Sequence, residues 1–299
     1  MEEITPRPPL QPQSTATAES TISQAEVQIL DFPSRVFRNL RKLRVWLPPG
    51  YQSPQNCERQ YPVFYLNDGQ NLFDPATSFT GVDWRAGQTA EILIREGKIP
   101  PLVLVGIDNA QAERIKEFLP YRSFRPPVLR PLGKRYPEFL FNEVMPFIEQ
   151  RYRIARGPEN TGLGGSSLGA LISLFTVMER PGLVGRLLAE SPSLYVSHRQ
   201  LLKRSRRFRE WPERIYLGIG TRESGRADRD QQYVEDVRKL ERSLHQAGVG
   251  DNRLRVRIDE GAAHNESEWA KRFPEALAFL WSADESRSNG KSEEPQSGS

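Results

Sequence analysis

The chain has 299 residues, a formal net charge of +4 and a mean hydropathy of −0.60, values that suit one large domain or two small ones. No stretch approaches the roughly 18 consecutive apolar residues of a membrane helix, and the N-terminus lacks the basic-then-apolar order of a secretory signal, so we expect a cytoplasmic protein. A single cysteine, Cys57, excludes an internal disulfide and a thiolate metal site.

Both ends of the chain are poor in large apolar residues. Residues 1–24 combine four prolines with serine, threonine and glutamine, and residues 282–299 are rich in glycine, serine and acidic residues. Such segments cannot bury enough apolar surface to offset the entropy lost on ordering. We therefore predict disordered tails at 1–24 and 282–299 and a single domain over residues 25–281.

Between the tails, short apolar runs alternate with longer amphipathic stretches. The runs predict strands at 43–47, 62–66, 102–107, 162–165, 187–189, 215–219 and 254–258. Apolar residues recur at spacings of three and four, which predicts helices, at 88–96, 137–152, 168–178, 231–246 and 266–281. Pro274 predicts a break of the last helix near Phe273. This alternation favours an α/β fold with a mostly parallel sheet flanked by helices on both faces, and such sheets bind ligands at the carboxyl ends of their strands.

The segment Gly165-Ser166-Ser167-Leu168-Gly169 matches the G-x-S-x-G pattern of a nucleophile elbow, between a predicted strand and a predicted helix. The two glycines leave room for the sharp turn that such a serine requires. Ser167 would then project over the sheet edge, where the backbone N–H of Leu168 can stabilise developing negative charge. The alternative is a glycine-rich turn whose serine caps the helix.

A serine nucleophile needs a histidine to accept its proton, and the chain has three. His198 lies at a basic helix and His245 near a helix end, and a structural role is favoured for both. His264 lies between the last predicted strand and helix, the loop where an α/β-hydrolase places its base. Asn265 and Glu268 resemble a capping box that would hold this loop. We therefore predict His264 as the general base.

The third member of a triad is a carboxylate between the serine and the histidine in chain order. Glu223 is the first carboxylate after the strand predicted at 215–219. Asp228 and Asp230 follow in the same loop and could replace it, and Glu190 is a weaker candidate at the end of the preceding strand. Glu223 is favoured and the others remain open.

Seven pieces of the sequence together resemble one known family. They are 45–51, 65–73, 99–109, 146–153, 165–169, 191–193 and 264–269. In this order they resemble the putative-esterase family of α/β-hydrolases, which includes esterase D, enterochelin-type siderophore esterases, feruloyl esterases and mycolyltransferases. The match runs from about Leu43 to Trp281, nearly the whole predicted domain.

The resemblance implies roles for particular residues. It implies Ser167 as nucleophile and His264 as base, and it favours Glu223 because relatives carry their acid in a Gly-Thr-x-Asp/Glu stretch that Gly220-Thr221-Arg222-Glu223 matches here. It also places the oxyanion hole at Asp68-Gly69-Gln70, with the backbone N–H of Gln70 joining that of Leu168. A plain turn capped by Asp68 or Asn71 is the alternative for this segment.

Basic residues concentrate in two segments, 113–135 and 199–214, each with a net charge of +5. Each follows a predicted strand, so we expect both to line the carboxyl edge of the sheet and to steer an anionic or phenolate-bearing ester. Asp68, Arg122 and Arg125 are the candidate substrate-binding residues. The alternative is a set of solvated surface arginines. Nothing resembles a nucleic-acid-binding module, so we expect neither nucleic acid nor membrane as a partner.

The predicted function is hydrolysis of a small-molecule carboxylic ester through an acyl-enzyme, with Ser167, His264 and Glu223 as the triad and without a cofactor or metal. Two alternatives stay open. An acyltransferase could use the same triad with another acceptor, and a catalytically silent hydrolase-fold protein could bind a ligand through its basic residues.

Overall fold

Six neighbouring parallel strands make up most of an eight-stranded sheet and extend to one of its edges. The computed structural model describes residues 27–282, so the tails predicted at 1–24 and 282–299 lie outside the described residues except for Ser282. The strand order is β1-β2-β4-β3-β7-β8-β9-β10. Neighbours from β4 to β10 pair in parallel, whereas β1 with β2 and β2 with β4 pair antiparallel.

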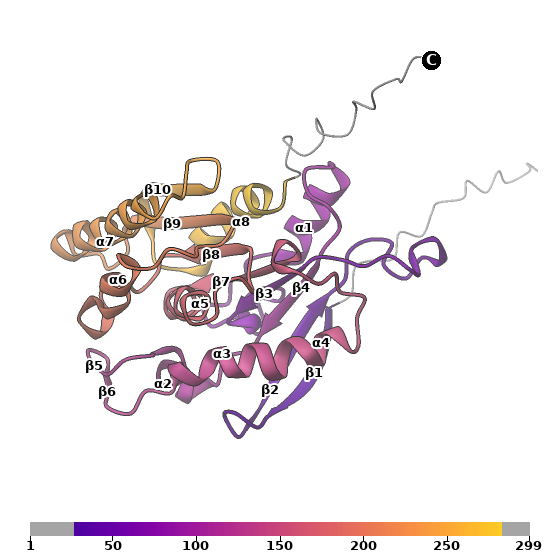
Figure 1. The fold of residues 1–299 in the computed structure, drawn as a ribbon, viewed down its shortest axis with the longest axis horizontal. Helices are drawn as coiled ribbons and strands as arrows, with labels where there is room; N and C mark the ends of the chain where they lie inside the picture. Colours follow the sequence, from indigo (N-terminus) through magenta and orange to yellow (C-terminus); the bar gives the residue numbers. More distant parts are fainter. Residues whose placement is uncertain (1–26, 283–299) are drawn as a thin grey trace, which may run out of the picture.

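The helices and strands follow one another along most of the chain (Figure 1). The strands are β1 (Val27–Ser34), β2 (Asn39–Trp46), β3 (Val63–Asn67), β4 (Val103–Ile107), β5 (Ser123–Phe124), β6 (Pro127–Val128), β7 (Thr161–Ser166), β8 (Arg186–Glu190), β9 (Arg214–Arg222) and β10 (Leu254–Ala263). The α-helices are α1 (Ala86–Arg95), α2 (Arg114–Phe118), α3 (Tyr136–Phe139), α4 (Met145–Glu149), α5 (Leu168–Glu179), α6 (Gln200–Ser205), α7 (Ala227–Gln246) and α8 (Glu266–Trp281). A π-helical turn, Leu140–Val144, joins α3 to α4.

Helices cover both faces of the sheet, and each face has its own apolar core. In β3, Val63 and Tyr65 pack in the core under α3 to α7, whereas Phe64 and Leu66 pack in the core under α1 and α8 (Figure 1). Successive side chains of a strand point to opposite faces, so a strand buried on both sides is apolar throughout. This explains why these strands appear as continuous apolar runs, and it confirms the predicted α/β architecture.

Helix α8 corrects the expectation that Pro274 ends a helix. The helix runs without interruption from Glu266 to Trp281 with Pro274 inside it. Proline removes one backbone hydrogen bond and its ring crowds the preceding turn. Apolar residues on both sides of it, such as Phe273 and Leu277, are completely buried against the sheet. The free energy gained by burying these side chains outweighs the local cost of the proline. Helix propensity alone does not include this gain.

The antiparallel edge strand β1 is a second difference, because no strand is predicted there from the sequence. From Ile29 to Ser34 its exposed residues alternate with residues that are partly or fully buried, such as Phe32, and it pairs along its whole length with β2. It also carries Pro33, which is tolerated at a sheet edge. Because one face of β1 is exposed to solvent, its sequence has no continuous apolar run that would predict a strand.

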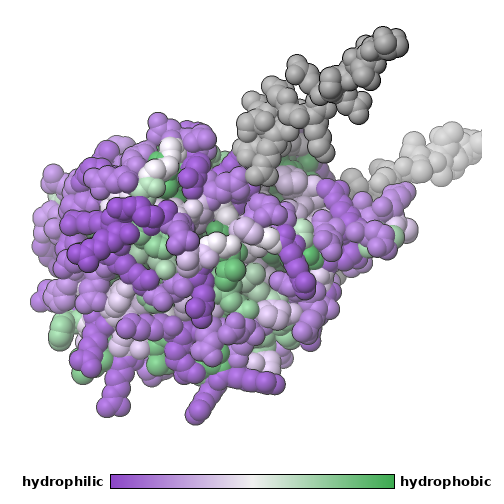
Figure 2. Space-filling model, in the orientation of Figure 1, coloured by the Kyte–Doolittle hydropathy of each residue, from purple (hydrophilic) through white to green (hydrophobic). Residues whose placement is uncertain are grey.

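The molecular surface is mostly hydrophilic, with scattered hydrophobic side chains on the face that Figure 2 shows. Phe79 and Phe124 are among the most exposed large apolar side chains. Among residues 27–282 no helix is long and apolar enough to cross a bilayer.

Replacing Pro274 by alanine tests the account of α8. We expect Pro274→Ala to raise the free energy of unfolding by about 1 to 2 kcal/mol, because a helical hydrogen bond is regained and only part of that gain is lost to a freer unfolded chain. Urea unfolding measures this, with the exposed Glu275→Ala as a control within about 0.5 kcal/mol of wild type. Destabilisation by Pro274→Ala would show that the ring itself is needed for packing.

Candidate active site

Ser167 lies on a sharp turn between β7 and α5, at the carboxyl edge of the sheet. Its backbone has φ 56° and ψ −120°, a left-handed conformation that costs a non-glycine residue free energy. The turn is held from the neighbouring strand, because the N–H of Ser167 donates to the carbonyl of Glu190 at 2.8 Å and the N–H of Ser193 donates to the carbonyl of Ser167 at 3.2 Å. The turn therefore points the Ser167 side chain away from the strand that carries it.

The two glycines of the motif are required by close packing around this turn. A Cβ at Gly165 would lie 3.0 Å from the Cβ of Asn67, and a Cβ at Gly169 would lie 3.1 Å from the same atom. Gly165 also has a positive φ of 159°. The Asn67 amide donates to the carbonyls of Gly164 and Gly169, both at 3.2 Å. The end of β3 is thereby tied to the turn that carries Ser167.

His264 follows β10 directly and faces Ser167. Its Nε2 lies 2.9 Å from the Ser167 Oγ. The ring packs edge-to-face on Trp269, with centroids 5.0 Å apart. Asn265 caps α8 by accepting a hydrogen bond from the Glu268 N–H at 3.1 Å, which confirms the expected cap and fixes the loop that holds the imidazole.

Glu223 lies just after β9 and is hydrogen-bonded through Oε2 to Nδ1 of His264. Its Oε1 accepts from the Ser191 hydroxyl and from the Gly220 N–H, each at 2.7 Å. Burial alone would raise the pKa of Glu223, but these hydrogen bonds and the charge of His264 together hold it below its ordinary value. The carboxylate is therefore ionised and fully hydrogen-bonded at neutral pH.

Ser191 connects Glu223 to the indole of Trp269. The Trp269 Nε1–H donates to the Ser191 Oγ at 2.9 Å, and that hydroxyl in turn donates to Glu223. Trp269 thus touches the imidazole with its ring and supports the carboxylate with its N–H. These buried hydrogen bonds fix the positions of Glu223 and Trp269, the two side chains that hold the His264 ring.

The structure places the other acidic candidates away from His264. Asp228 is exposed and paired with Arg226, and Asp230 accepts from the N–H and the hydroxyl of Ser224 at 2.6 Å and 2.7 Å. Glu190 is completely buried, and Arg272 donates to it at 2.8 Å. Burial raises the pKa of Glu190, with the Arg272 charge opposing that shift.

The two remaining histidines also lie elsewhere. The Nδ1 of His245 is 2.9 Å from the carbonyl of Val249, at the end of α7. His198 packs beside Phe124, with ring centroids 5.9 Å apart. Neither contacts Ser167, as the structural interpretation of both residues expects.

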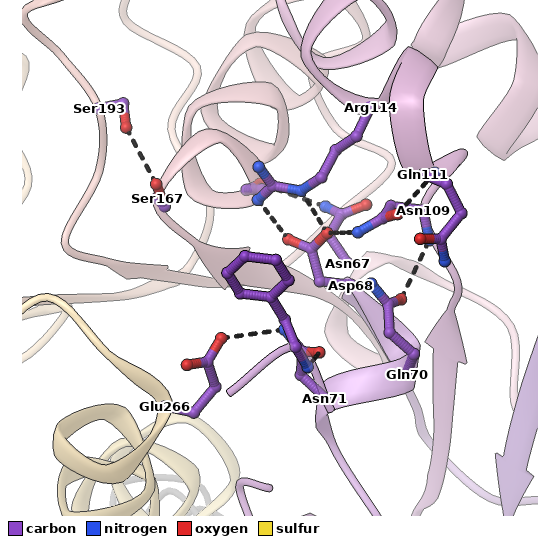
Figure 3. Close-up of polar contacts among 12 residues, drawn as sticks. Asn67, Asp68, Gln70, Asn71, Asn109, Gln111, Arg114, Ser167, Ser193 and Glu266 are labelled. Carbon is purple, nitrogen blue, oxygen red and sulfur yellow. Dashed lines mark hydrogen bonds and ion pairs between the residues drawn. The ribbon is translucent and has the colours of Figure 1, made fainter. Parts of the chain in front are cut away.

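The loop after β3 is held by a buried carboxylate (Figure 3). Asp68 accepts two hydrogen bonds from Arg114, at 2.6 Å from Nε and 2.7 Å from Nη2, and one from Asn109 at 2.6 Å. Burial alone would lower the pKa of the Arg114 guanidinium, but the charge and hydrogen bonds of Asp68 raise it. Arg114 therefore stays charged, and Asp68 positions it at the site.

Gly69 lets this loop cross β4 at close range. A Cβ there would lie 2.5 Å from the carbonyl carbon of Gly106, so no other residue fits. The left-handed residue is Asp68, with φ 58°, rather than the glycine. Gln70 follows in the first turn of a 3₁₀ helix, Gly69–Asn71, and its side-chain oxygen accepts from the Asn109 N–H at 3.2 Å. N–H groups in a first helical turn have no acceptor within the helix, as is also true of Leu168 at the start of α5.

A second buried carboxylate, Glu266, joins the N-terminus of α8 to the segment between β3 and α1. Asn71 donates to it at 3.1 Å (Figure 3). Thr80 donates to it at 2.8 Å. The positive end of the helix dipole favours a carboxylate at this position. This contact links the loop of Gln70 to the loop of His264.

A cavity of about 530 Å³ opens at Ser167 and His264. Its walls come from the loops after β3, β4, β7 and β10, which is the carboxyl edge of the sheet. The polar side of the lining includes Arg114 and Asn109, and the apolar side includes Phe79, Ile115 and Trp269. The volume suits one small organic group rather than a polymer.

The substrate-binding candidates do not lie together. Asp68 lines the cavity at Ser167 with its carboxylate bound to Arg114. Arg125 lines a different cavity, and Arg122 is exposed and lines neither that cavity nor the one at Ser167.

The expectation that all of segment 199–214 follows the carboxyl edge is wrong. Its first residue, Arg199, lies there, but Arg214 begins β9 and therefore lies at the opposite edge. A connection between parallel strands runs from the carboxyl end of one strand back to the amino end of the next. Basic residues distributed along such a connection therefore cannot all lie at one edge of the sheet. Of the first segment, Arg114 reaches the cavity at Ser167.

Sequence reasoning assigned no role to several residues of the site. Ser191, Ser193, Glu266 and Trp269 all occur in the segments that carry the family resemblance, which was the available signal. The Ser193 hydroxyl lies 3.2 Å from that of Ser167 (Figure 3). Arg114 had no such signal beyond its position after β4.

A family model described as putative esterase matches residues 34–280. The chain belongs to this esterase family. The match covers all the elements that build the site, and it confirms the expectation of an ester hydrolase of the serine type.

Two proteins of Bacillus subtilis are similar to this chain in sequence. The uncharacterized protein YbbA is 25% identical over 246 residues, which cover 81% of this chain and 92% of YbbA. The ferri-bacillibactin esterase BesA is 27% identical over 163 residues, which cover 50% of this chain and 53% of BesA.

Solved structures share the fold at lower identity. An IroE-like serine hydrolase from Shewanella oneidensis is 20% identical with a TM-score of 0.66, over 86% of this chain and 80% of that chain. The enterobactin esterase FES from Shigella flexneri, solved in the presence of enterobactin, is 20% identical with a TM-score of 0.65, over 91% of this chain and 62% of that one. This chain therefore spans about three fifths of the enterobactin esterases that it matches.

The ion pair of Asp68 and Arg114 gives a stability prediction. We expect Arg114→Met to lower the free energy of unfolding by about 2 to 4 kcal/mol, because it leaves a buried carboxylate without its cation. Asp68→Asn and the double variant complete a mutant cycle measured by urea unfolding. The double variant should lose less than the sum of the single losses, with a coupling of about 1 kcal/mol or more. Simple additivity would contradict the pairing.

The lowered pKa of Glu223 gives a pH prediction. A carboxylate whose pKa is lowered by folding stabilises the protein above its unfolded pKa, about 4.3, and this contribution is lost as the pH falls through the folded pKa. We expect Glu223→Gln to be less stable than wild type by about 1 to 2 kcal/mol at pH 7, with a smaller difference near pH 4. Unfolding curves at both pH values measure this. A difference that is constant with pH would contradict the assigned shift.

Proposed function

We propose that this protein hydrolyses carboxylic esters through an acyl-enzyme, with Ser167, His264 and Glu223 as its catalytic residues. The observation that carries the proposal is the continuous contact from the Ser167 hydroxyl to His264, at 2.9 Å, and from His264 to Glu223. These residues come from three separate loops after β7, β9 and β10. A packing requirement alone does not explain a strained serine that meets a histidine and a buried carboxylate in this order.

In the acylation step, the Ser167 oxygen attacks the ester carbonyl carbon while Nε2 of His264 takes the hydroxyl proton. The carbonyl oxygen becomes negatively charged and accepts hydrogen bonds from the N–H groups of Leu168 and Gln70. Each such donor lowers the barrier by about 3 kcal/mol. His264 then gives its proton to the leaving alcohol, and the C–O bond breaks.

In the second step, His264 takes a proton from water as the water oxygen attacks the acyl carbon. His264 then gives that proton to the Ser167 oxygen as the bond between this oxygen and the acyl carbon breaks, which releases the acid and restores Ser167. Glu223 holds Nδ1–H of the imidazole and stabilises its charged form in both steps. Ser191 and Trp269 are positioning residues, because they act through Glu223 and through the orientation of the ring.

The substrate class proposed is a small ester with an anionic or phenolic part. Arg114 supports this, since it presents a charged guanidinium in the same cavity as Ser167. The relatives named for esterase activity on ferri-bacillibactin and enterobactin support the same class. Hydrolysis is favoured over acyl transfer to another acceptor because the relatives BesA and FES are both named as esterases.

A fluorophosphonate probe and a short p-nitrophenyl ester test the proposal together. We expect the probe to label Ser167, located by peptide mass spectrometry, and to abolish hydrolysis in proportion to labelling. Ser167→Ala should lose both the label and at least about 1,000-fold of kcat/KM. Ser193→Ala is the matched control, because it removes a neighbouring hydroxyl and should keep the label.

Two results would overturn the mechanism. One is a Ser167→Ala variant that hydrolyses the ester as fast as wild type, and the other is a label that attaches to Ser193. Product analysis in the presence of added alcohols separates hydrolysis from transfer, since an acyltransferase would give mainly the new ester.

A further inference from the structure

A second cavity, of about 500 Å³, lies beside the β5–β6 hairpin and the N-terminal part of α7. Its lining shares no residue with that of the cavity at Ser167. The second cavity nevertheless lies close to the Ser167 site along the chain. Tyr195 lines the second cavity, and Ser193, two residues before it, contacts Ser167. Two residues span at most about 7 Å.

Three arginines from separate segments converge on this cavity: Arg125, Arg199 and Arg229. Arg199 is bound to the buried Asp236 through Nε, at 2.7 Å and 2.9 Å. Arg125 and Arg229 form no ion pair with any residue of the described range 27–282. No carboxylate is among the lining residues found there. The cavity therefore has uncompensated positive charge.

Aromatic rings form two walls of the cavity. Tyr195 and Tyr233 are stacked, with centroids 4.3 Å apart and planes 20° apart. The second pair is Phe124, from β5, and His198, three residues after Tyr195, with ring centroids 5.9 Å apart. Phe124 is 67% exposed, so its ring is available for contact with a ligand. Flat aromatic groups and guanidinium groups both stack well on such surfaces.

Ser123 gives a further, independent indication of a ligand. It lines the cavity and is only 1% exposed, and its buried Oγ has no hydrogen-bond partner within the described residues. A buried hydroxyl without a partner costs free energy, and a ligand oxygen would satisfy it.

The backbone at the cavity is also strained. Ser197, His198 and Arg199 are consecutive left-handed residues, with φ values of 50°, 53° and 60°, and none is glycine. The strain is maintained by contacts of the same residues, since Ser197 donates to the Tyr121 carbonyl at 3.1 Å and Arg199 binds Asp236. Strained segments of this kind concentrate at ligand sites.

From these observations we propose that the cavity lined by Arg125, Arg229 and the Tyr195–Tyr233 stack binds an aromatic carboxylate. The ligand carboxylate lies between the two guanidinium groups and accepts a hydrogen bond from the Ser123 hydroxyl. The ligand ring lies against the aromatic side chains that line the cavity. This site is separate from the one that holds the scissile bond. The proposal does not depend on the esterase mechanism, because it concerns binding alone.

Titration calorimetry with benzoate tests the site. We expect benzoate to bind and benzamide, its neutral counterpart of the same shape, to bind at least about tenfold more weakly. Inorganic phosphate tests whether charge alone suffices. Phosphate binding as tight as that of benzoate would overturn the aromatic part of the proposal.

Variants on one helix separate this cavity from general surface charge. Arg229→Gln should weaken benzoate binding by about tenfold or more, since it removes a charged hydrogen-bond donor. Arg238→Gln is the matched control. It removes an exposed arginine nine residues further along α7, on the opposite side of the helix, and should leave binding unchanged. Equal effects of the two substitutions would overturn the site.

A third variant separates the two cavities. Ala112 lines the cavity at Ser167 and does not line the second cavity, so Ala112→Trp is designed to narrow the first cavity alone. We expect Ala112→Trp to bind benzoate as wild type does. Loss of benzoate binding in this variant would place the ligand at Ser167 instead. Because no turnover is measured, these results stand whether or not Ser167 proves to be the nucleophile.

Discussion

The left-handed turn at Ser167 is the constraint on which the rest of the site depends. Such a conformation costs about 1 to 3 kcal/mol and persists only where its surroundings hold it. Here β3 holds it through Asn67, and β8 holds it through the backbone of Glu190 and Ser193. Both neighbouring strands must therefore be in register before the serine can face His264. The parallel sheet acts first as the support of one strained residue.

Three buried carboxylates around this turn each have a basic partner, whereas Glu266 is held by hydrogen bonds from Asn71 and Thr80. Asp68 binds Arg114, Glu190 binds Arg272, and Glu223 binds His264. Each pair joins segments that are far apart in the sequence, so each also fixes one loop against another. An unpaired carboxylate in these places would cost several kcal/mol. Rigidity of the site thus follows from electrostatics as much as from apolar packing.

Local sequence patterns predict the positions of Ser167 and Glu223. The continuity of α8 and the pairing of Arg114 depend on contacts between distant parts of the sequence. Ser167 stands in a motif with two glycines, and Glu223 is the first carboxylate after an apolar strand, so short-range rules could place both. Whether they catalyse remains a proposal. The continuity of α8 through Pro274 comes from burial against the sheet, and the pairing of Arg114 with Asp68 spans 46 residues, so neither has a local signal. Segment 199–214 shows the same limit, because composition does not reveal which edge each arginine reaches.

The segment from Ser193 to Tyr195 connects the two sites, since Ser193 contacts Ser167 and Tyr195 lines the second cavity, and this arrangement has a consequence for catalysis. A charged group bound among Arg125 and Arg229 is remote from the carbonyl at Ser167, and its contacts are the same before and during the reaction. Binding energy of that kind lowers KM without raising kcat. In the proposed mechanism, by contrast, Ser167, the N–H groups of Leu168 and Gln70, and the Glu223–His264 pair act on the charge that forms in the transition state. Selection of the ligand and acceleration of the reaction therefore rest on different residues of the same sheet edge.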